Sequence, residues 1–131
     1  MSNKIDKILA EISAGELFDK ITILEIKKAK ISNKDKLNDI EKELLSLNET
    51  VKKYIPNQSS ISKYVNDLKH INLKLWDIED GKRAAEKNKD FGEKFIELAR
   101  NVYKFNDERA KIKLIINTSL GSNIKEVKSY E

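Results

Sequence analysis

The chain has 131 residues but no cysteine, one proline and four glycines. The lack of cysteine excludes disulfides and thiolate metal sites and is compatible with a reducing, cytoplasmic location. So little glycine and proline leaves few residues for the tight turns of a many-stranded sheet. Apolar runs are only a few residues long, as at 114–116, and the first residues contain no apolar run of signal-peptide length, so we expect neither a membrane span nor a signal peptide. We therefore expect a cytoplasmic protein without a membrane partner.

Charge of one sign is also lacking. The chain carries 26 basic and 22 acidic residues, a net charge of +4, and the two signs are intermixed along its length. Nucleic-acid-binding proteins more often show a basic stripe, so we do not expect a nucleic-acid partner. Charged residues make up 37% of the chain and apolar residues 39%. This balance is typical of helices with one apolar stripe and a solvated remainder.

Apolar residues recur in steps of three and four along most of the chain, which predicts helices. We expect helices at about 13–31, 34–54, 60–86 and 90–121, with residues 1–12 ambiguous between a short helix and an extended segment. Short connections between long helices predict an all-α fold, an antiparallel up-down helical bundle of about four helices. We assign residues 1–121 to one domain and 122–131 to a polar C-terminal tail, mobile unless Tyr130 docks.

Local signals mark where these helices begin and end. Ser13 followed by Glu16 resembles a capping box, in which each side chain binds a backbone amide at the helix start. Asp90 is the predicted N-cap of the fourth helix. Gly121 suits the left-handed position that ends it.

Arginine is scarce: all but three of the basic residues are lysine, and the three arginines are Arg83, Arg100 and Arg109. Arginine offers a planar, permanently charged fork for carboxylate or phosphate and stacks on aromatic rings, whereas lysine is a point charge. The arginines share one window with Tyr103, and the single tryptophan, Trp76, lies just upstream. This window is our candidate functional region.

We expect the third and fourth helices to be antiparallel, because they are joined by a short connection near residues 87–90. Two residues then lie opposite each other along the helix pair when their numbers add to roughly 178. Glu79 and Asp80 then lie beside Arg100, and Trp76 lies near Tyr103. We consider two interpretations of the charged set. The carboxylates could orient the arginine for an anionic ligand or hold a divalent ion, or they could form an interhelical salt bridge.

Arg109 lies within the apolar stripe of the fourth helix, at a position where a hydrophobic residue is expected. An unpaired buried charge costs about 3–5 kcal/mol, so this guanidinium needs a partner. Asp107 and Glu108 are poorly placed along the same helix, and we expect the partner on another helix or on a ligand. Arg109 is then either half of an ion pair that sets helix register or a ligand clamp.

Two carboxylate pairs, Glu16 with Asp19 and Asp77 with Asp80, have the spacing of one helical face. Facing pairs of this kind can bind magnesium through oxygen ligands, as in helical nucleotide hydrolases. The same height estimate puts Asp19 and Asp80 near opposite ends of the bundle, which weakens this alternative. We predict no metal site or cofactor, with magnesium as the alternative.

Several segments together resemble a bacterial and phage family whose domain has no assigned function. The resemblance covers about residues 11–131, although residues 33–66 match only by pattern. It rests on the following stretches: Gly15-Glu16-Leu17-Phe18-Asp19-Lys20-Ile21-Thr22-Ile23-Leu24-Glu25-Ile26-Lys27, Leu75-Trp76-Asp77-Ile78-Glu79-Asp80 with Arg83, Phe95-Ile96-Glu97-Leu98-Ala99-Arg100-Asn101-Val102-Tyr103, Asn106-Asp107-Glu108-Arg109-Ala110, Lys113, Ile116-Asn117 and the ending Gly121-Ser122 with Glu126, Lys128 and Tyr130. The resemblance implies a link to sugar or surface-polysaccharide metabolism but no catalytic residues.

Three functions fit these observations. The leading hypothesis is a small helical binding or accessory module, not an enzyme, that recognises a phosphate or carboxylate group on a small molecule or a protein. The first alternative is a small helical enzyme, chorismate-mutase-like or a magnesium-dependent nucleotide hydrolase. The second is a structural protein-interaction bundle, and long apolar stripes are compatible with a homodimer. The predicted ligand-binding residues are Trp76, Glu79, Asp80, Arg83, Arg100, Tyr103, Asp107 and Arg109.

Overall fold

The computed structural model describes residues 4–125 and 127, and these residues form four helices and no strand. The helices are α1 (Ala14–Lys30), α2 (Lys34–Tyr54), α3 (Ser62–Lys87) and α4 (Glu93–Leu120). The predicted all-α helical bundle is confirmed. The predicted bounds of α2 agree with the structure, and those of the other helices differ by a few residues.

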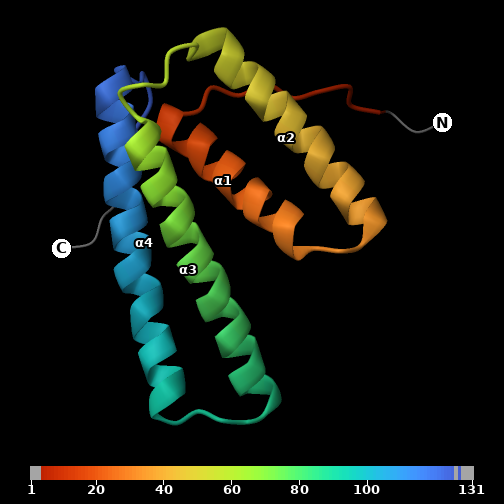
Figure 1. The fold of residues 1–131 in the computed structure, drawn as a ribbon, viewed down its shortest axis with the longest axis vertical. Helices are drawn as coiled ribbons and strands as arrows, with labels where there is room; N and C mark the ends of the chain where they lie inside the picture. The colour runs from red at the N-terminus through yellow and green to blue at the C-terminus, as the bar shows by residue number, and fades with distance from the viewer. Residues whose placement is uncertain (1–3, 126, 128–131) are drawn as a thin grey trace.

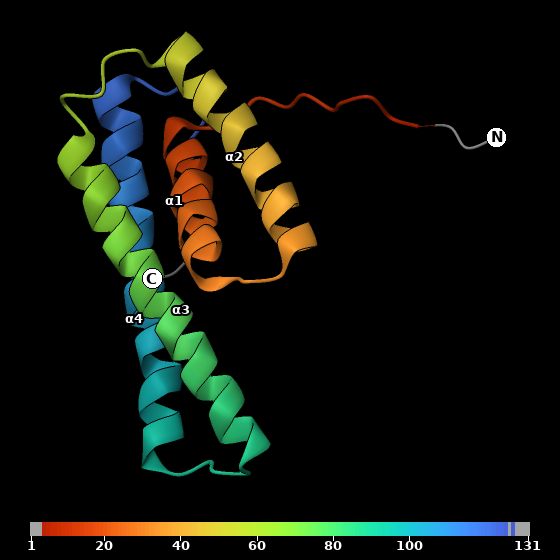
Figure 2. The ribbon, with the colours of Figure 1, turned by 45° about the vertical axis from the view of Figure 1, so that its right-hand side comes forward.

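Helix α1 lies at the centre of the fold. It packs against the other three helices, and α3 packs along α4 as a long antiparallel hairpin (Figure 1). Among the described helices, α2 packs against α1 alone. The hairpin of α3 and α4 extends beyond the end of α1, as both ribbon views show (Figure 2). The bundle is therefore complete around α1 and only two helices thick beyond it.

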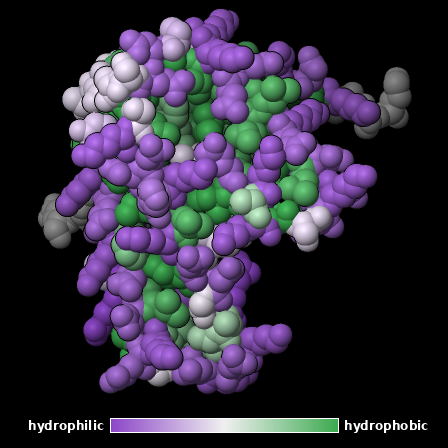
Figure 3. Space-filling model, in the orientation of Figure 1, coloured by the Kyte–Doolittle hydropathy of each residue, from purple (hydrophilic) through white to green (hydrophobic). Residues whose placement is uncertain are grey.

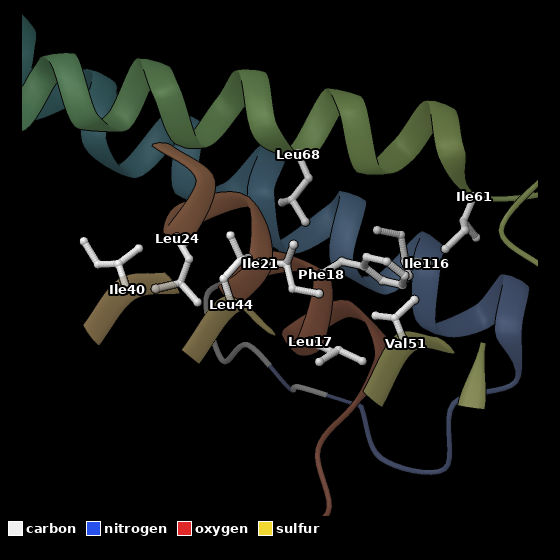
Figure 4. Packing of buried hydrophobic residues seen from close by; sticks show 10 residues of the cluster. All are labelled: Leu17, Phe18, Ile21, Leu24, Ile40, Leu44, Val51, Ile61, Leu68 and Ile116. Atoms are coloured by element: carbon white, nitrogen blue, oxygen red, sulfur yellow. The ribbon is translucent and has the colours of Figure 1, made fainter. Parts of the chain in front are cut away.

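The hydrophobic core fills the space between α1 and its neighbours (Figure 4). Phe18 and Ile21 of α1 are buried there, as the apolar spacing predicts. Tyr54, which the same spacing predicts at the end of the α2 stripe, is 69% exposed because it lies at the last residue of that helix. The buried members of the core are Leu17, Phe18, Ile21, Leu24, Ile40, Leu44, Val51, Ile61, Leu68 and Ile116.

The helix ends follow local chemistry. The Ser13 half of the predicted capping box is confirmed, since the Ser13 hydroxyl accepts a hydrogen bond from the Glu16 amide at 3.1 Å. The Glu16 carboxylate instead accepts a hydrogen bond from Lys113. The predicted Asp90 N-cap is wrong: Gly92 occupies that position, and Asp90 instead accepts a hydrogen bond from the Gly92 amide. Gly121 ends α4 with φ at 63°, the left-handed conformation expected there.

Helix α3 continues to Lys87, through the polar stretch after Gly81 where the apolar pattern fades. At Gly81 the helix packs closely on α4, because an added Cβ would lie 3.2 Å from Leu98. This contact also agrees with the predicted height relation between the two helices. Ile78, three residues earlier, is buried in the same hairpin.

The two terminal segments of the described chain adjoin the start of α1 and the end of α4. Residues 4–12 have no regular secondary structure, so the short-helix alternative is not found in them. The predicted tail begins in contact with the start of α1. The Ser122 hydroxyl accepts a hydrogen bond from the backbone amide of Ala14, and the side-chain amide of Asn123 donates to the Glu11 carboxylate. Tyr130 lies outside the described residues.

Candidate functional site

A buried carboxylate, Asp19 of α1, lies where α1, α3 and α4 meet. Its side chain is 2% exposed. Arg109 of α4 donates from Nε to Oδ1 at 2.9 Å and from Nη2 to Oδ2 at 2.5 Å. Asn72 of α3 donates to Oδ1 at 2.9 Å. Of the two predicted partners for Arg109, another helix or a ligand, the structure shows the first: Asp19 of α1 accepts from both Nε and Nη2.

The polar contacts continue around this carboxylate. Asn72 also donates to the Thr22 hydroxyl at 2.9 Å, and that hydroxyl donates to the Asp19 carbonyl. Lys113 of α4 is buried, and its Nζ lies 2.8 Å from Oε2 of Glu16 and 3.7 Å from Oδ2 of Asp19. We call the set Glu16, Asp19, Thr22, Asn72, Arg109 and Lys113 the Asp19 network.

The start of α1 is bound to the end of α4 beside this network. The Gly15 amide donates to Oδ1 of Asn117 at 2.6 Å. A Cβ at Gly15 would lie 2.6 Å from the Lys113 carbonyl oxygen, so only glycine permits this approach. The hydrogen bond satisfies an amide that the first turn of a helix leaves unpaired.

The network lowers the pKa of Asp19. Burial by itself raises this pKa, because it penalises the charged carboxylate. The hydrogen bonds from Arg109 and Asn72 and the positive charges of Arg109 and Lys113 act in the opposite direction and outweigh the burial. Asp19 is therefore ionised at neutral pH, as a partner for two cations must be.

The buried polar groups of the Asp19 network bind one another. Among the described residues, no buried side-chain nitrogen or oxygen lacks a hydrogen-bond partner. The cations that face the interior, Arg109 and Lys113, bind the carboxylates of Asp19 and Glu16. The geometry favours the interpretation of Arg109 as part of a register-setting ion pair over that of a ligand clamp.

The structure separates Arg109 from the other two arginines. Arg83 and Arg100 are exposed, and neither forms an ion pair with any carboxylate of residues 4–125. Gly81 and Leu98 face each other, and each arginine comes two residues later, about 200° around its helix at 100° per residue. Arg83 and Arg100 therefore project away from the partner helix, toward opposite edges of the hairpin.

The predicted salt bridge of Glu79 or Asp80 with Arg100 is not found in the described part of the chain. Glu79 instead lies 3.6 Å from Lys82 of its own helix. Both acidic residues are exposed on α3. The estimate placed these residues at the correct height along the hairpin, as the approach of Gly81 to Leu98 shows. It does not specify the direction in which a side chain points around its helix, and Arg100 points away from α3.

The remaining predicted residues are spread along the hairpin. Trp76 and Asp107 are partly buried, and Tyr103 is 57% exposed. The residues of the Asp19 network other than Arg109 were not predicted as site residues. The sequence did contain a signal for most of them. Glu16, Asp19, Thr22 and Lys113 all belong to the stretches that carry the family resemblance, and the fold brings those stretches together at this network.

Two findings limit the chemistry of the described residues. No three His, Asp or Glu side chains among them are grouped so that they could hold a metal ion. None of their helices is both long enough and apolar enough to cross a membrane. The facing carboxylate pairs of a magnesium-dependent hydrolase are thus not assembled in this part of the chain.

Comparison with known proteins identifies a family but no activity. The model of a family of unknown function (DUF6165) matches residues 8–131, nearly the whole chain. No curated protein and no solved structure matches. Any account of function must come from the residues and geometry of this chain.

Proposed function

Because the chain belongs to the DUF6165 family of unknown function, we propose from its own residues that it is a small, non-enzymatic helical binding module. The recognised group is anionic, a phosphate or a carboxylate. The site lies on the exposed surface of α4 around Arg100, with Tyr103 beside it. A phosphorylated sugar would suit both the chemistry and the predicted link to sugar or surface-polysaccharide metabolism.

One observation carries this proposal: Arg100 is an exposed arginine without an ion pair to any carboxylate in residues 4–125. Its neighbours on the same helical face are Tyr103 and Lys104, both exposed, at the i+3 and i+4 positions. The guanidinium supplies a fork for an oxyanion, the lysine a second positive charge, and the tyrosine a ring and a hydroxyl. Together they supply the elements of an open anion site.

The expected affinity is weak because the surface is exposed to water. Hydrogen bonds to charged groups contribute roughly 1.5–3 kcal/mol each. Two such bonds correspond to a dissociation constant on the order of 1 mM. Titrations should therefore extend to at least about ten times that concentration.

The test is an NMR titration of the full chain with glucose 1-phosphate, inorganic phosphate and succinate, with glucose as the uncharged control. We expect the anions to shift the amide signals around Arg100 and glucose to leave them unchanged. Arg100→Lys should remove the response, whereas Arg83→Lys, at the opposite edge of the hairpin, should keep it. An unchanged response in Arg100→Lys would exclude this arginine from the site, and no response to any anion would refute the proposal.

The enzyme alternatives have less support. A chorismate-mutase-like site needs cations inside the bundle that are directed at a dianionic ligand, and here Arg109 and Lys113 bind Asp19 and Glu16. A partner-binding role is the stronger second candidate, because α3 and α4 extend beyond α1 as a two-helix layer (Figure 2). A cytoplasmic location, supported by the lack of cysteine, is part of our proposal.

A further inference from the structure

The surface that α1 covers on α3 and α4 continues along the hairpin without a cover. Arg109 faces α1, and one and two heptads earlier on α4 stand Val102 and Phe95. Lys113 also faces α1, and two heptads earlier stands Ala99. Positions seven residues apart share a helical face, so these residues continue the α1-facing surface.

The same reasoning applies to α3. Leu68 lies in the core and points toward Ile21 of α1 (Figure 4), and one heptad later stands Leu75. We call this uncovered surface the distal face; it consists of Leu75, Phe95, Ala99 and Val102, with Tyr103 at its edge. Glu79 and Glu86, one and two heptads after Asn72, form its rim on α3.

Burial shows that the distal face is incomplete. Leu68 and Ile116, in the part covered by α1, are 0% exposed. Of residues 73–105, Ile78 alone is buried. In the distal face, Leu75, Phe95 and Val102 are only partly buried, and Ala99 is exposed. Figure 3 shows hydrophobic residues on the surface of the hairpin beyond α1. The distal face therefore lacks a third helix that would cover it as α1 covers the rest of the hairpin.

The chain also carries an apolar segment with nothing to pack against. Residues 4–12, which we call the arm, project from the bundle (Figure 1). Ile5, Ile8 and Leu9 are 74%, 78% and 86% exposed, and Ile12 is 40% exposed. Their i, i+3, i+4, i+7 spacing is that of one face of a helix, so the arm can form a short amphipathic helix once that face is covered.

The arm cannot complete the distal face of its own chain. It is joined to the start of α1, where Gly15 binds Asn117, and the Asn123 amide donates to Glu11 at 2.6 Å. Ala99 lies 18 residues before Asn117 on α4, a distance of about 27 Å at 1.5 Å per residue. As a helix, residues 5–12 span only about 12 Å.

We propose that the arm of one copy folds as a helix on the distal face of a second copy, and that the exchange is reciprocal in a two-fold dimer. The apolar face of the arm covers Phe95, Ala99 and Val102 of the other copy. Lys4, which flanks the apolar face of the arm, then lies toward Glu86 in the rim, since Glu79 already pairs with Lys82. A two-fold dimer is the commonest closed assembly and satisfies both unpaired surfaces at once.

The test uses the full chain and two variants at exposed positions, where folding is not affected. The arm variant is Ile8→Ser with Leu9→Ser, and the face variant is Ala99→Glu. The control is Leu45→Ser, a 63% exposed leucine on α2 outside both surfaces. Mass is measured by sedimentation equilibrium over a wide concentration range, and circular dichroism verifies that helicity is unchanged.

We expect the wild type and the control to dimerise, and each variant to dissociate at about a hundredfold higher concentration, because buried apolar contacts are lost. Mixing the two variants should restore a heterodimer through the one intact arm and the one intact face. Pairing of two distal faces would instead leave the arm variant dimeric. A monomeric wild type, a dimeric arm variant or a failure of the mixture would each refute the exchange.

This inference and the proposed anion site share Tyr103, and Ala99→Glu places a carboxylate beside Arg100. The phosphate response is therefore compared in the arm variant, Ile8→Ser with Leu9→Ser, which changes no residue near Arg100. Loss of dimerisation with an intact response to phosphate, or the reverse, therefore distinguishes the failure of one proposal from that of the other.

Discussion

Arg109 binds Asp19 with two nitrogens of its fork, Nε to Oδ1 at 2.9 Å and Nη2 to Oδ2 at 2.5 Å, although the two residues lie 90 positions apart. This pair joins α4 to α1, and Asn72 brings α3 to the same carboxylate. A bidentate pair restricts the relative orientation of its two helices as well as their distance. The Asp19 network thus sets how α1 lies on the hairpin, and through α1 how α2 lies.

Asp19→Asn should strongly destabilise the protein. The substitution leaves Arg109 and Lys113 facing the interior without the carboxylate that neutralises them. Breaking a buried pair costs about 3–5 kcal/mol, and because Arg109 remains 29% exposed we expect about 3 kcal/mol. Urea unfolding followed by circular dichroism measures this change. Asp77→Asn, at an exposed site on α3, should cost less than about 0.5 kcal/mol.

Arg109→Lys should be milder but still costly. Lysine keeps the charge but cannot donate to both Asp19 oxygens in the planar geometry of the guanidinium. We expect a loss of about 1–2 kcal/mol in the free energy of unfolding. Arg83→Lys, at an exposed position, should leave unfolding unchanged. Equal stability of the two variants would show that the fork geometry adds nothing beyond charge.

Acid should remove the contribution of Asp19. Its pKa is lowered in the folded state, so its stabilisation is complete above the pKa of the unfolded chain, about 4. The contribution is lost as the pH falls from there through the folded pKa. The difference in unfolding free energy between wild type and Asp19→Asn should therefore be constant near neutral pH and shrink below about pH 4. Urea titrations between pH 2.5 and 7 provide the comparison, and a difference that does not shrink in acid would contradict this account.

Gly15→Ala should force α1 away from α4. The added Cβ would lie 2.6 Å from the Lys113 carbonyl oxygen and 2.9 Å from Oδ1 of Asn117. Overpacking of this kind costs about 1–3 kcal/mol, and here it also strains the hydrogen bond from the Gly15 amide. Gly92→Ala is the control, because an added Cβ there would lie 3.5 Å from an oxygen of the flexible Asp90 side chain. A loss no greater than that of Gly92→Ala in thermal unfolding would contradict the close approach.

Ser13→Ala should weaken the start of α1. The lost hydrogen bond to the Glu16 amide is worth about 1 kcal/mol. Asn33→Ala removes the corresponding cap of α2 at an exposed site. We expect Ser13→Ala to cost more, because Ser13 is 5% exposed and water cannot replace the bond as easily. Urea midpoints of the two variants test this order.

The sequence predicted the need of Arg109 for a partner but not the partner itself. A polar residue in an apolar stripe signals that need, whatever the tertiary arrangement. The choice of Asp19 depended on how α1 crosses the hairpin, which periodicity does not determine. The two carboxylates of α1 were considered only as magnesium ligands, whereas Lys113 binds Glu16 and Arg109 binds Asp19.

Arg100 illustrates the opposite case. Its height on the hairpin was predicted adequately, and its direction was not. The contact of Gly81 with Leu98 decides which sides of α3 and α4 face each other, and Arg100 then lies on the outside. Because a one-residue step rotates a side chain by about 100°, a small error in register changes its partner completely.

The sequence by itself determined four helices, most of their ends and which residues form the apolar stripes, because these depend on contacts within a few residues: 3.6-residue periodicity, the Ser13 cap and the left-handed Gly121. Only the tertiary structure decided which charges meet and where the stripes remain uncovered. Those outcomes depend on crossing angles and helix rotation, which arise from packing between residues far apart in the chain. Asp19 with Arg109, and the uncovered distal face beyond α1, are the two results of that packing on which the function of this protein can now be tested.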